Sequence, residues 1–170
     1  YFIFFTIICF LVASYEWHKM TKKINNKLLG LIFLIFSFLA FYEILTDYYK
    51  GIFVLLICVA TDVGGYFFGK IFKGPKLTKI SPNKTYSGMI GGYFLSLISL
   101  SHFLNWINHE ISINWFIVTI LVSTISQIGD IIISYFKRLS KIKNTGKIIP
   151  GHGGLLDRID GMIFAFPFFY

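Results

Sequence analysis

The chain alternates long apolar runs with short polar, lysine-rich stretches. A helix needs about 20 apolar residues to cross a hydrocarbon core of about 30 Å. The runs cover residues 1–13, 28–46, 51–69, 88–106 and 115–136, and a sixth begins near 161. We interpret the first, shorter run as the remainder of a longer span. The pattern predicts an all-α, polytopic integral membrane protein with about six transmembrane helices, forming a single membrane domain over residues 1–170.

The composition supports a place in the bilayer. The chain is 55% hydrophobic, contains 20 Phe and is only 14% charged. A soluble domain of this size cannot bury so much apolar surface, so the lipid bilayer is the expected surrounding, and no nucleic-acid partner is expected. Cys9 and Cys58 lie in apolar runs and form neither a disulfide framework nor a metal motif. The chain starts without Met and stops in an apolar run, so we expect it to be incomplete at one or both ends.

The positive charges predict the topology. Of 16 cations, four lie between the first two runs, five between the third and fourth, and six between the fifth and sixth; only Lys50 lies elsewhere. The positive-inside rule therefore places the three lysine-rich stretches in the cytoplasm and the start of the chain outside. We expect a multi-pass inner (cell) membrane protein whose active site faces the cytoplasm. Any single lysine could also serve only to orient the chain.

The stretch 126–160 carries the most chemistry. Asp130 lies near the end of a predicted span, where a charge costs roughly 2.5–3.5 kcal/mol unless it faces a cavity or a partner. On a helix, Asp130, Ser134 and Lys137 share one face. Asp157 and Asp160 also share a face if a helix has started there. Two acidic helix ends that flank a basic, glycine-rich loop predict a site for a metal ion and phosphate groups.

The rare arginines and one histidine add to this prediction. The chain has 14 Lys and only two Arg, Arg138 and Arg158, both in this stretch. The rigid guanidinium suits bidentate contact with phosphate, which lysine cannot copy. His152 lies between glycines in P-G-H-G-G, where it could donate a proton or a hydrogen bond to a phosphate oxygen. A zinc site is not expected, because no second His or Cys stands at zinc spacing.

A second candidate region follows the third apolar run. The loop between the third and fourth runs is rich in lysine, glycine and hydroxyl groups that suit a polyphosphate, although it lacks the spacing of a P-loop. Asp62 precedes it, and two roles stay open for this acid, namely a buried partner of a lysine or a substrate contact. Gly65 and Gly69 lie on one helix face and would let another helix approach closely, which would also suit a homodimer.

At these residues the sequence resembles a known family. The segment S-Y-F-K-R-x4-K-N-x-G-x3-P-G-H-G-G-x2-D-R-x-D resembles the signature of the phosphatidate cytidylyltransferases, also called CDP-diacylglycerol synthases. The earlier segments T-D-x-G-G-Y-F-x-G-K and I-S-P-N-K-T-x-x-G are similar to two further blocks of that family, in the same order. The resemblance implies a membrane enzyme of phospholipid biosynthesis. It would join CTP to phosphatidic acid, giving CDP-diacylglycerol and pyrophosphate, and use Mg²⁺, with room for a second metal ion.

The resemblance also implies roles for residues. It places the catalytic part at residues 60–161, with two basic cytoplasmic loops, and leaves residues 1–59 as N-terminal spans. The metal would be held by Asp130 and Asp157, to which the helix-face argument adds Asp160. Catalysis is expected to involve Asp130, Lys137, Arg138, His152 and Asp157. Substrate binding is expected to involve Asp62, Ser81, Pro82, Lys84, Thr85, Ser134, Gly153 and Arg158.

The sequence departs from the family pattern at three positions. Asn144, Ser87 and Ile133 stand where acids are usual, so fewer metal ligands are expected. Two other functions stay open. One is a cytidylyltransferase that acts on another lipid phosphate, and the other is a non-enzymatic, ion-coupled membrane transporter. The clustering of polar residues at one membrane face argues against the transporter, because transporters bind their ions near the midplane between broken helices.

Overall fold

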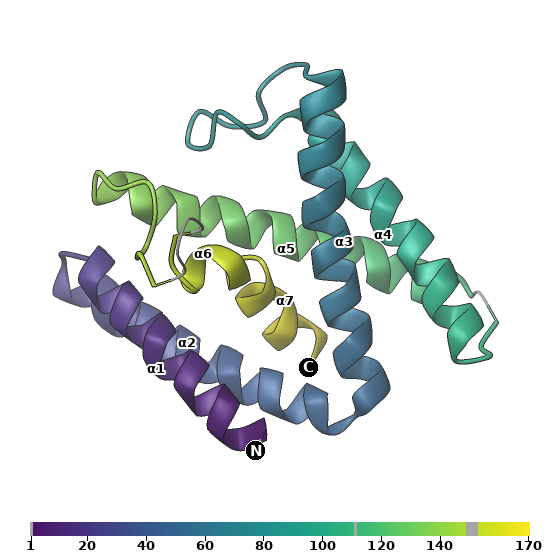
Figure 1. Ribbon diagram of the computed structural model, residues 1–170, viewed down its shortest axis with the longest axis horizontal. Coiled ribbons are helices and arrows are strands. Elements are labelled where there is room, and N and C mark those ends of the chain that lie inside the picture. Colours follow the sequence, from purple (N-terminus) through teal and green to yellow (C-terminus); the bar gives the residue numbers. More distant parts are fainter. Residues whose placement is uncertain (1, 111, 149–152) are drawn as a thin grey trace.

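The described residues form an all-helical structure. The computed structural model describes residues 2–110, 112–148 and 153–170, and no β-strand occurs in these ranges. Five long helices and two short ones follow one another (Figure 1), with bounds α1 (Phe2–Met20), α2 (Ile24–Thr46), α3 (Tyr48–Phe72), α4 (Tyr86–Trp106), α5 (Ile113–Leu139), α6 (Leu156–Ile159) and α7 (Met162–Phe169). Helices α1 to α5 are each long and apolar enough to cross a membrane. The predicted polytopic all-α class is therefore confirmed, and α7 begins where the sixth span was predicted.

Two antiparallel helix pairs enclose the short C-terminal helices. In Figure 1, α1 and α2 form one pair, α3 and α4 form the other, and α5 crosses α3 while α6 and α7 lie between the pairs. Helix α7 packs against α2, α3 and α5. Segments that are distant in sequence therefore meet at α6, which lies close to the end of α5 that carries Asp130.

Polar side chains cap the N-terminal ends of α3 and α4. Asp47 alone separates α2 from α3, and its side chain accepts a hydrogen bond from the backbone N–H of Lys50 at 3.3 Å. Thr85 begins α4 in the same way, because its hydroxyl accepts a hydrogen bond from Gly88 N at 3.1 Å. Asp and Thr are favoured at these positions since a short side-chain oxygen can satisfy a first-turn N–H.

Glycines bring α3 and α4 into backbone contact. A Cβ added to Gly64 would lie 2.4 Å from the carbonyl oxygen of Gly91, and one added to Gly88 would lie 2.6 Å from that of Gly65. Gly69 lies beside Thr85 and Gly88 of the same pair. The predicted close helix approach at Gly65 and Gly69 is therefore confirmed. Its partner is α4 of the same chain, so these glycines no longer argue for a homodimer.

Helix α1 is longer than the apolar pattern predicts. The first apolar run ends at residue 13, but α1 continues to Met20, and only residues 21–23 connect it to α2. The reason is packing, since Trp17 and Met20 are 5% and 2% exposed in a core that they share with α2 and α7. This extension places Glu16 inside the protein.

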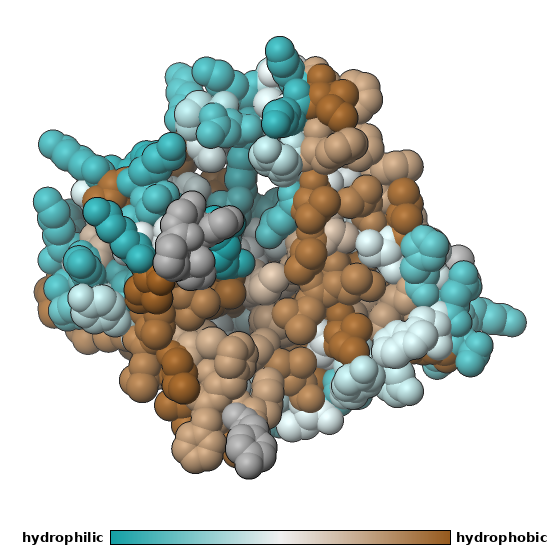
Figure 2. All heavy atoms as spheres, viewed as in Figure 1, coloured by the Kyte–Doolittle hydropathy of each residue, from teal (hydrophilic) through white to brown (hydrophobic). Residues whose placement is uncertain are grey.

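Polar residues gather at opposite ends of the molecule. Figure 2 shows hydrophilic side chains at the upper left and at the right, with hydrophobic side chains between them. The α1–α2 and α3–α4 connections and the C-terminal end of α5 lie toward the upper left in Figure 1, while the α2–α3 and α4–α5 turns lie away from them. The three lysine-rich stretches therefore share one end, as predicted from counting charges.

Candidate active site

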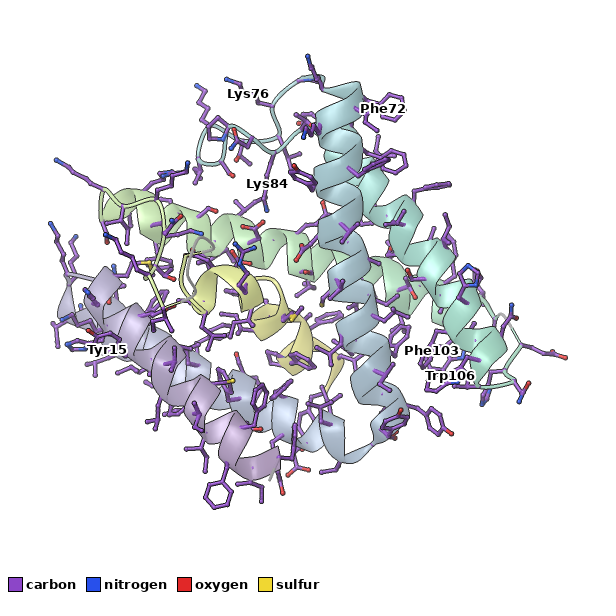
Figure 3. All side chains as sticks on the ribbon, in the orientation of Figure 1. Tyr15, Phe72, Lys76, Lys84, Phe103 and Trp106 are labelled. Carbon is purple, nitrogen blue, oxygen red and sulfur yellow. The ribbon has the colours of Figure 1, made fainter. Side chains whose placement is uncertain are left out.

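One polar cavity collects residues from all three sequence blocks. It has a volume of about 460 Å³ and lies between the α3–α4 loop, the polar face of α5 and helix α6. In Figure 3, Lys84 reaches from that loop toward α5, whereas Lys76 lies on the outer part of the loop. The predicted site residues that line the cavity are Asp62, Ser81, Lys84, Thr85, Asp130, Ser134, Lys137, Arg138, Asp157, Arg158 and Asp160.

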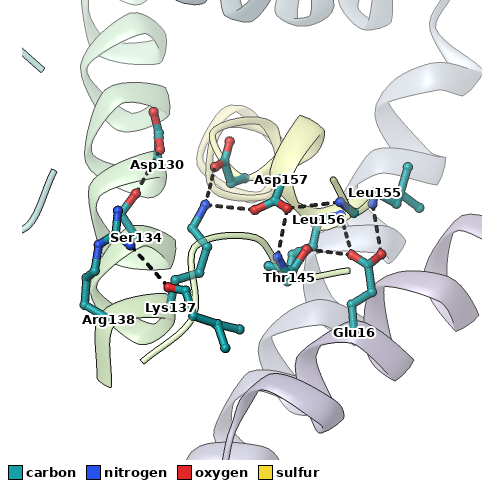
Figure 4. Close-up of polar contacts among 12 residues, drawn as sticks. Glu16, Asp130, Ser134, Lys137, Arg138, Thr145, Leu155, Leu156 and Asp157 are labelled. Carbon is teal, nitrogen blue, oxygen red and sulfur yellow. Dashed lines mark hydrogen bonds and ion pairs between the residues drawn. The ribbon is translucent and has the colours of Figure 1, made fainter. Parts of the chain in front are cut away.

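Helix α5 supplies the predicted acid, hydroxyl and ammonium face. Ser134 Oγ donates a hydrogen bond to Asp130 Oδ1 at 3.4 Å, and Lys137 lies one turn further along (Figure 4). Ser134 and Lys137 are 7% and 9% exposed. A lysine so well buried needs a countercharge, and Asp157 provides it, with Nζ 2.9 Å from Oδ1.

Asp157 is held in place from three directions. Its Oδ2 accepts the backbone N–H groups of Thr145 at 2.8 Å and Gly154 at 3.0 Å, and its Oδ1 faces Lys137. Burial opposes ionisation of this group, but the hydrogen bonds from Lys137 and the two backbone amides outweigh it and hold the pKa of Asp157 below its ordinary value. The side chain is therefore a fixed carboxylate.

Asp160 lies on the other side of the same ammonium. Its Oδ2 is 3.8 Å from Lys137 Nζ, and its Oδ1 accepts the N–H of Gly161 at 3.0 Å. Burial, reinforced by the negative charge of Asp130, raises the pKa of Asp160 well above its ordinary value, against the opposing effect of Lys137. Asp130 and Asp160 are close enough for their carboxyl groups to hydrogen-bond. The predicted acids on two helices are thus brought together.

The α3–α4 loop forms the opposite wall. Backbone hydrogen bonds from Leu77 N to Lys84 O, at 2.7 Å, and from Tyr86 N to Pro75 O, at 3.1 Å, fold it back on itself. The Lys84 ammonium forms an ion pair with Asp130. Pro82, which was predicted to bind substrate, does not line the cavity, although its neighbour Ser81 does.

Arg138 connects the two walls. Its Nε donates to the carbonyl oxygen of Ile80 in the loop at 3.4 Å, and its NH1 donates to that of Ile142 at 3.2 Å. Its side chain is exposed and lines the cavity, so its other donors can face an anion there.

The structure does not show two further predicted site residues in the lining of the cavity. His152 lies outside the described residues, and Gly153 does not line the cavity but lies directly beside Asp157, with φ +89°.

The sequence argument missed several residues of the site and its support. Thr61, Asn83, Gln127 and Lys143 also line the cavity. Glu16 of α1 lies behind it, 1% exposed, and accepts a hydrogen bond from Thr145 Oγ1 at 2.9 Å. The only signal for Glu16 in the sequence is that an acid follows shortly after the first apolar run, which ends at residue 13.

Comparison with known proteins shows the family of this chain. The family model described as "Cytidylyltransferase family" matches residues 2–170. The chain belongs to the cytidylyltransferase family. Two curated relatives are named phosphatidate cytidylyltransferase. The one from Staphylococcus aureus (strain COL) is 41% identical over 135 residues, which are 77% of this chain and 52% of the relative. The one from Rickettsia prowazekii (strain Madrid E) is 38% identical over 169 residues, which are 91% and 73%. The chain thus spans about half the length of the staphylococcal relative.

The three departures from the family pattern lie in different environments. Asn144 lines the cavity. Ile133 is 2% exposed and packs in the core with α1 and α2, so an acid there would be buried away from the site. Ser87 donates to the carbonyl oxygen of Lys73 and contacts the Thr85 hydroxyl at 2.9 Å, outside the cavity. Of the three positions, only that of Asn144 would place an acid in the lining of the cavity.

The acids suit a hard divalent cation together with substrate oxygens. Among the residues that the structure describes, no group of three or more His, Cys, Asp or Glu side chains is arranged to hold a metal ion by itself. Mg²⁺ does not need such a group, because it commonly binds through one or two carboxylates plus phosphates and waters. Asp130, Asp157 and Asp160 line the same cavity, where Asp130 pairs with Lys84 while Asp157 and Asp160 share the ammonium of Lys137. The residues present therefore fit the predicted metal in number and type.

Proposed function

We propose that the protein transfers the CMP group of CTP to phosphatidic acid, giving CDP-diacylglycerol and pyrophosphate. The observation that carries this proposal is the cavity in which carboxylates of α5 and the 157–160 segment face lysines and arginines of the second and third predicted blocks, with Asp62 of the first block in the same lining. Membership of the cytidylyltransferase family and relatives named phosphatidate cytidylyltransferase support it.

The reaction depends more on positive charge that offsets the charge of its anionic reactants than on acid or base catalysis. An oxygen of the lipid phosphate attacks the α-phosphorus of CTP, the bond from that phosphorus to the bridging oxygen breaks, and its electron pair leaves with pyrophosphate. A phosphomonoester is already anionic near neutral pH, so no strong general base is required. Both reactants are anions, and positioning with electrostatic stabilisation supplies most of the rate in such transfers.

The cations of the cavity are placed for this task. Lys84 and Lys137 are paired with Asp130 and Asp157, and each ammonium is close to the open cavity. Arriving phosphates offer these ammonium groups new partners. Arg138 and Arg158 line the same cavity and can bind phosphate oxygens in a bidentate manner. One or two carboxylates among Asp130, Asp157 and Asp160, together with phosphate oxygens, would hold Mg²⁺, which would supply Lewis-acid stabilisation of the phosphate charge.

The cavity also suits a lipid that stays in the bilayer. Tyr66 and Met89 line it on the α3–α4 side, and Tyr66 is 69% exposed, so the cavity extends to the outer surface of these helices. An acyl-bearing phosphate can enter from this side while CTP enters from the lysine-rich end. We place that end in the cytoplasm, where the positive-inside rule and the supply of CTP agree.

The decisive experiment is an assay with membranes that contain the protein and labelled CTP. With phosphatidic acid and Mg²⁺, we expect a labelled liponucleotide and stoichiometric pyrophosphate, and a chelator should stop both. Product only with a polyprenyl phosphate or an ether-lipid phosphate would assign another lipid acceptor. Ion-gradient-dependent uptake without any liponucleotide would overturn the enzymatic proposal in favour of a transporter.

A further inference from the structure

Glu16 of α1 is a buried acid that the reaction itself does not use. It is 1% exposed, and its carboxylate accepts three hydrogen bonds (Figure 4). Thr145 Oγ1 donates to Oε2 at 2.9 Å, Leu156 N donates to Oε2 at 2.9 Å, and Leu155 N donates to Oε1 at 3.0 Å. A buried carboxylate is costly unless it is hydrogen-bonded, and these donors come from a segment 129 to 140 residues away. The contact therefore ties α1 to the segment that carries Asp157.

Two glycines shape that segment around the Glu16 carboxylate. A Cβ added to Gly146 would lie 2.4 Å from Glu16 Oε1, and a Cβ added to Gly154 would lie 2.4 Å from Oε2. Real side chains do not approach this closely, so the backbone can surround the carboxylate only because both positions are glycine. Gly146 follows Thr145 and Gly154 precedes Leu155 along the chain, so the Glu16 carboxylate lies against both stretches of chain that donate hydrogen bonds to it.

Glu16 and Asp157 share the same backbone supports. Thr145 donates its hydroxyl to Glu16 and its N–H to Asp157 Oδ2. The backbone N–H groups of residues 154–156 are divided between the two acids in the same way. Gly154 N donates to Asp157 Oδ2, while Leu155 N and Leu156 N donate to Glu16. The orientation of Asp157 toward Lys137 therefore depends on backbone groups that Glu16 fixes from behind.

We propose that Glu16 is a positioning residue of the active site, which sets the orientation of Asp157 through Thr145 and Gly154. On this basis α1 is part of the catalytic apparatus, although it contributes no group to the cavity. The catalytic side of this inference rests on the proposed cytidylyl transfer, whereas the structural side can be measured without any substrate.

The first test is amide hydrogen exchange on the full chain carrying Glu16→Gln, with Glu43→Gln as the matched control. Glu43 is exposed on α2. We expect faster exchange in Glu16→Gln at Leu155 and Leu156, and also at Thr145 and Gly154, whose N–H groups bind Asp157 rather than Glu16. Faster exchange confined to Leu155 and Leu156 would overturn the proposal, because Asp157 would then be held independently.

The second test is kinetic. We expect kcat of Glu16→Gln to fall about ten- to hundredfold, because small misplacements of a reacting site cost this much. The Mg²⁺ concentration for half-activity should rise, while the KM for CTP changes little. Equal kcat and Mg²⁺ dependence in Glu16→Gln and Glu43→Gln would refute the positioning role. If the wild-type chain makes no liponucleotide, the proposed function fails, and the exchange experiment still decides the role of Glu16.

A milder pair of variants covers the case in which Glu16→Gln does not fold. Thr145→Val removes the hydroxyl that bonds Glu16 but keeps the N–H that bonds Asp157, whereas Thr145→Ser keeps both. We expect Thr145→Val to show the exchange change at Gly154 and the lower kcat, and Thr145→Ser to restore both. Identical behaviour of the two variants would count against the proposal.

Discussion

The two walls of the cavity are built in different ways. On the acid wall, Asp157 and Asp160 bond to backbone N–H groups, and Glu16 supports the same segment from behind. On the loop wall, residues 75–86 bond mainly to their own backbone, and two polar contacts described above connect them to α5, from Lys84 to Asp130 and from Arg138 of α5 to the carbonyl oxygen of Ile80. One wall is anchored by buried carboxylates and the other by two contacts at the cavity surface.

This difference separates the tasks of the two walls. In the proposed reaction, groups that would hold a metal ion and define the line of attack need fixed positions, and the carboxylates of the acid wall have such positions. Groups that recruit and release a nucleotide must exchange partners in each cycle, and an ammonium that is paired with an acid at the cavity surface can do so. We therefore expect changes on the acid wall to affect the chemical step most, and changes on the loop wall to affect nucleotide binding as well.

The largest effect is expected on the acid wall. Asp157→Asn removes the charge that Lys137 neutralises and that would help to hold the metal, so we expect product formation to fall about a thousandfold, since metal assistance is worth several kcal/mol. The rate of liponucleotide formation in purified protein measures this. Asp47→Asn is the control, because Asp47 caps α3 outside the cavity and Asn caps as well as Asp. Near wild-type activity in Asp157→Asn would remove the metal assignment.

The loop wall should give a smaller effect. Lys84→Met deletes the ammonium that pairs with Asp130 but keeps the length of the side chain. A charged hydrogen bond is worth about 1.5–3 kcal/mol, so we expect kcat/KM for CTP to fall about ten- to hundredfold. Lys76→Met is the matched control, since Lys76 is exposed in the same loop and does not line the cavity. Equal losses in the two variants would mean that only the overall charge of the loop matters.

The contrast between the walls also explains what the sequence could predict. Apolar run length is a local property, so it predicted the spans, and lysine counts predicted that the basic stretches share one end. The spacing of Asp130, Ser134 and Lys137 predicted their common face, because helix geometry alone decides it. The charged side chains of the acid wall could therefore be predicted from the sequence.

The residues that support the acid wall from behind could not be predicted from the sequence. Glu16 binds residues more than a hundred positions away, and no local pattern encodes that contact. Its burial follows from the packing of Trp17 and Met20, which extends α1 past the end of the apolar run. Pro82 and Ile133 are the opposite case. Both lie in sequence motifs of which other members line the cavity, but neither of their side chains does so, and Ile133 packs in the core.

Arg138 joins the walls and should show an intermediate effect. Arg138→Lys keeps the charge but loses the forked donors that reach Ile80 O and Ile142 O together. We expect the KM for CTP to rise about tenfold, because an ammonium group cannot replace the bidentate contact of a guanidinium with phosphate, and such a contact is worth at least about 1.4 kcal/mol. The melting temperature should change little, because the side chain is exposed. Lys141→Arg, an exchange at a nearby exposed residue, is the control. Unchanged turnover and KM in Arg138→Lys would show that a simple charge suffices.

The smallest effect is expected at Asn144, where a charge can be added beside the acid wall. Asn144 lines the cavity and lies next to Gly153, the neighbour of Asp157, so Asn144→Asp places a further carboxylate near the expected metal. A unit charge about 4 Å from another contributes about 1 kcal/mol in water, and we expect the Mg²⁺ concentration for half-activity to fall about fivefold. Ser87→Asp is the control, because Ser87 lies outside the cavity, and it should leave the Mg²⁺ dependence unchanged. A Mg²⁺ titration that shifts equally in both variants would show that general surface charge, rather than a ligand position beside Asp157, sets the metal requirement.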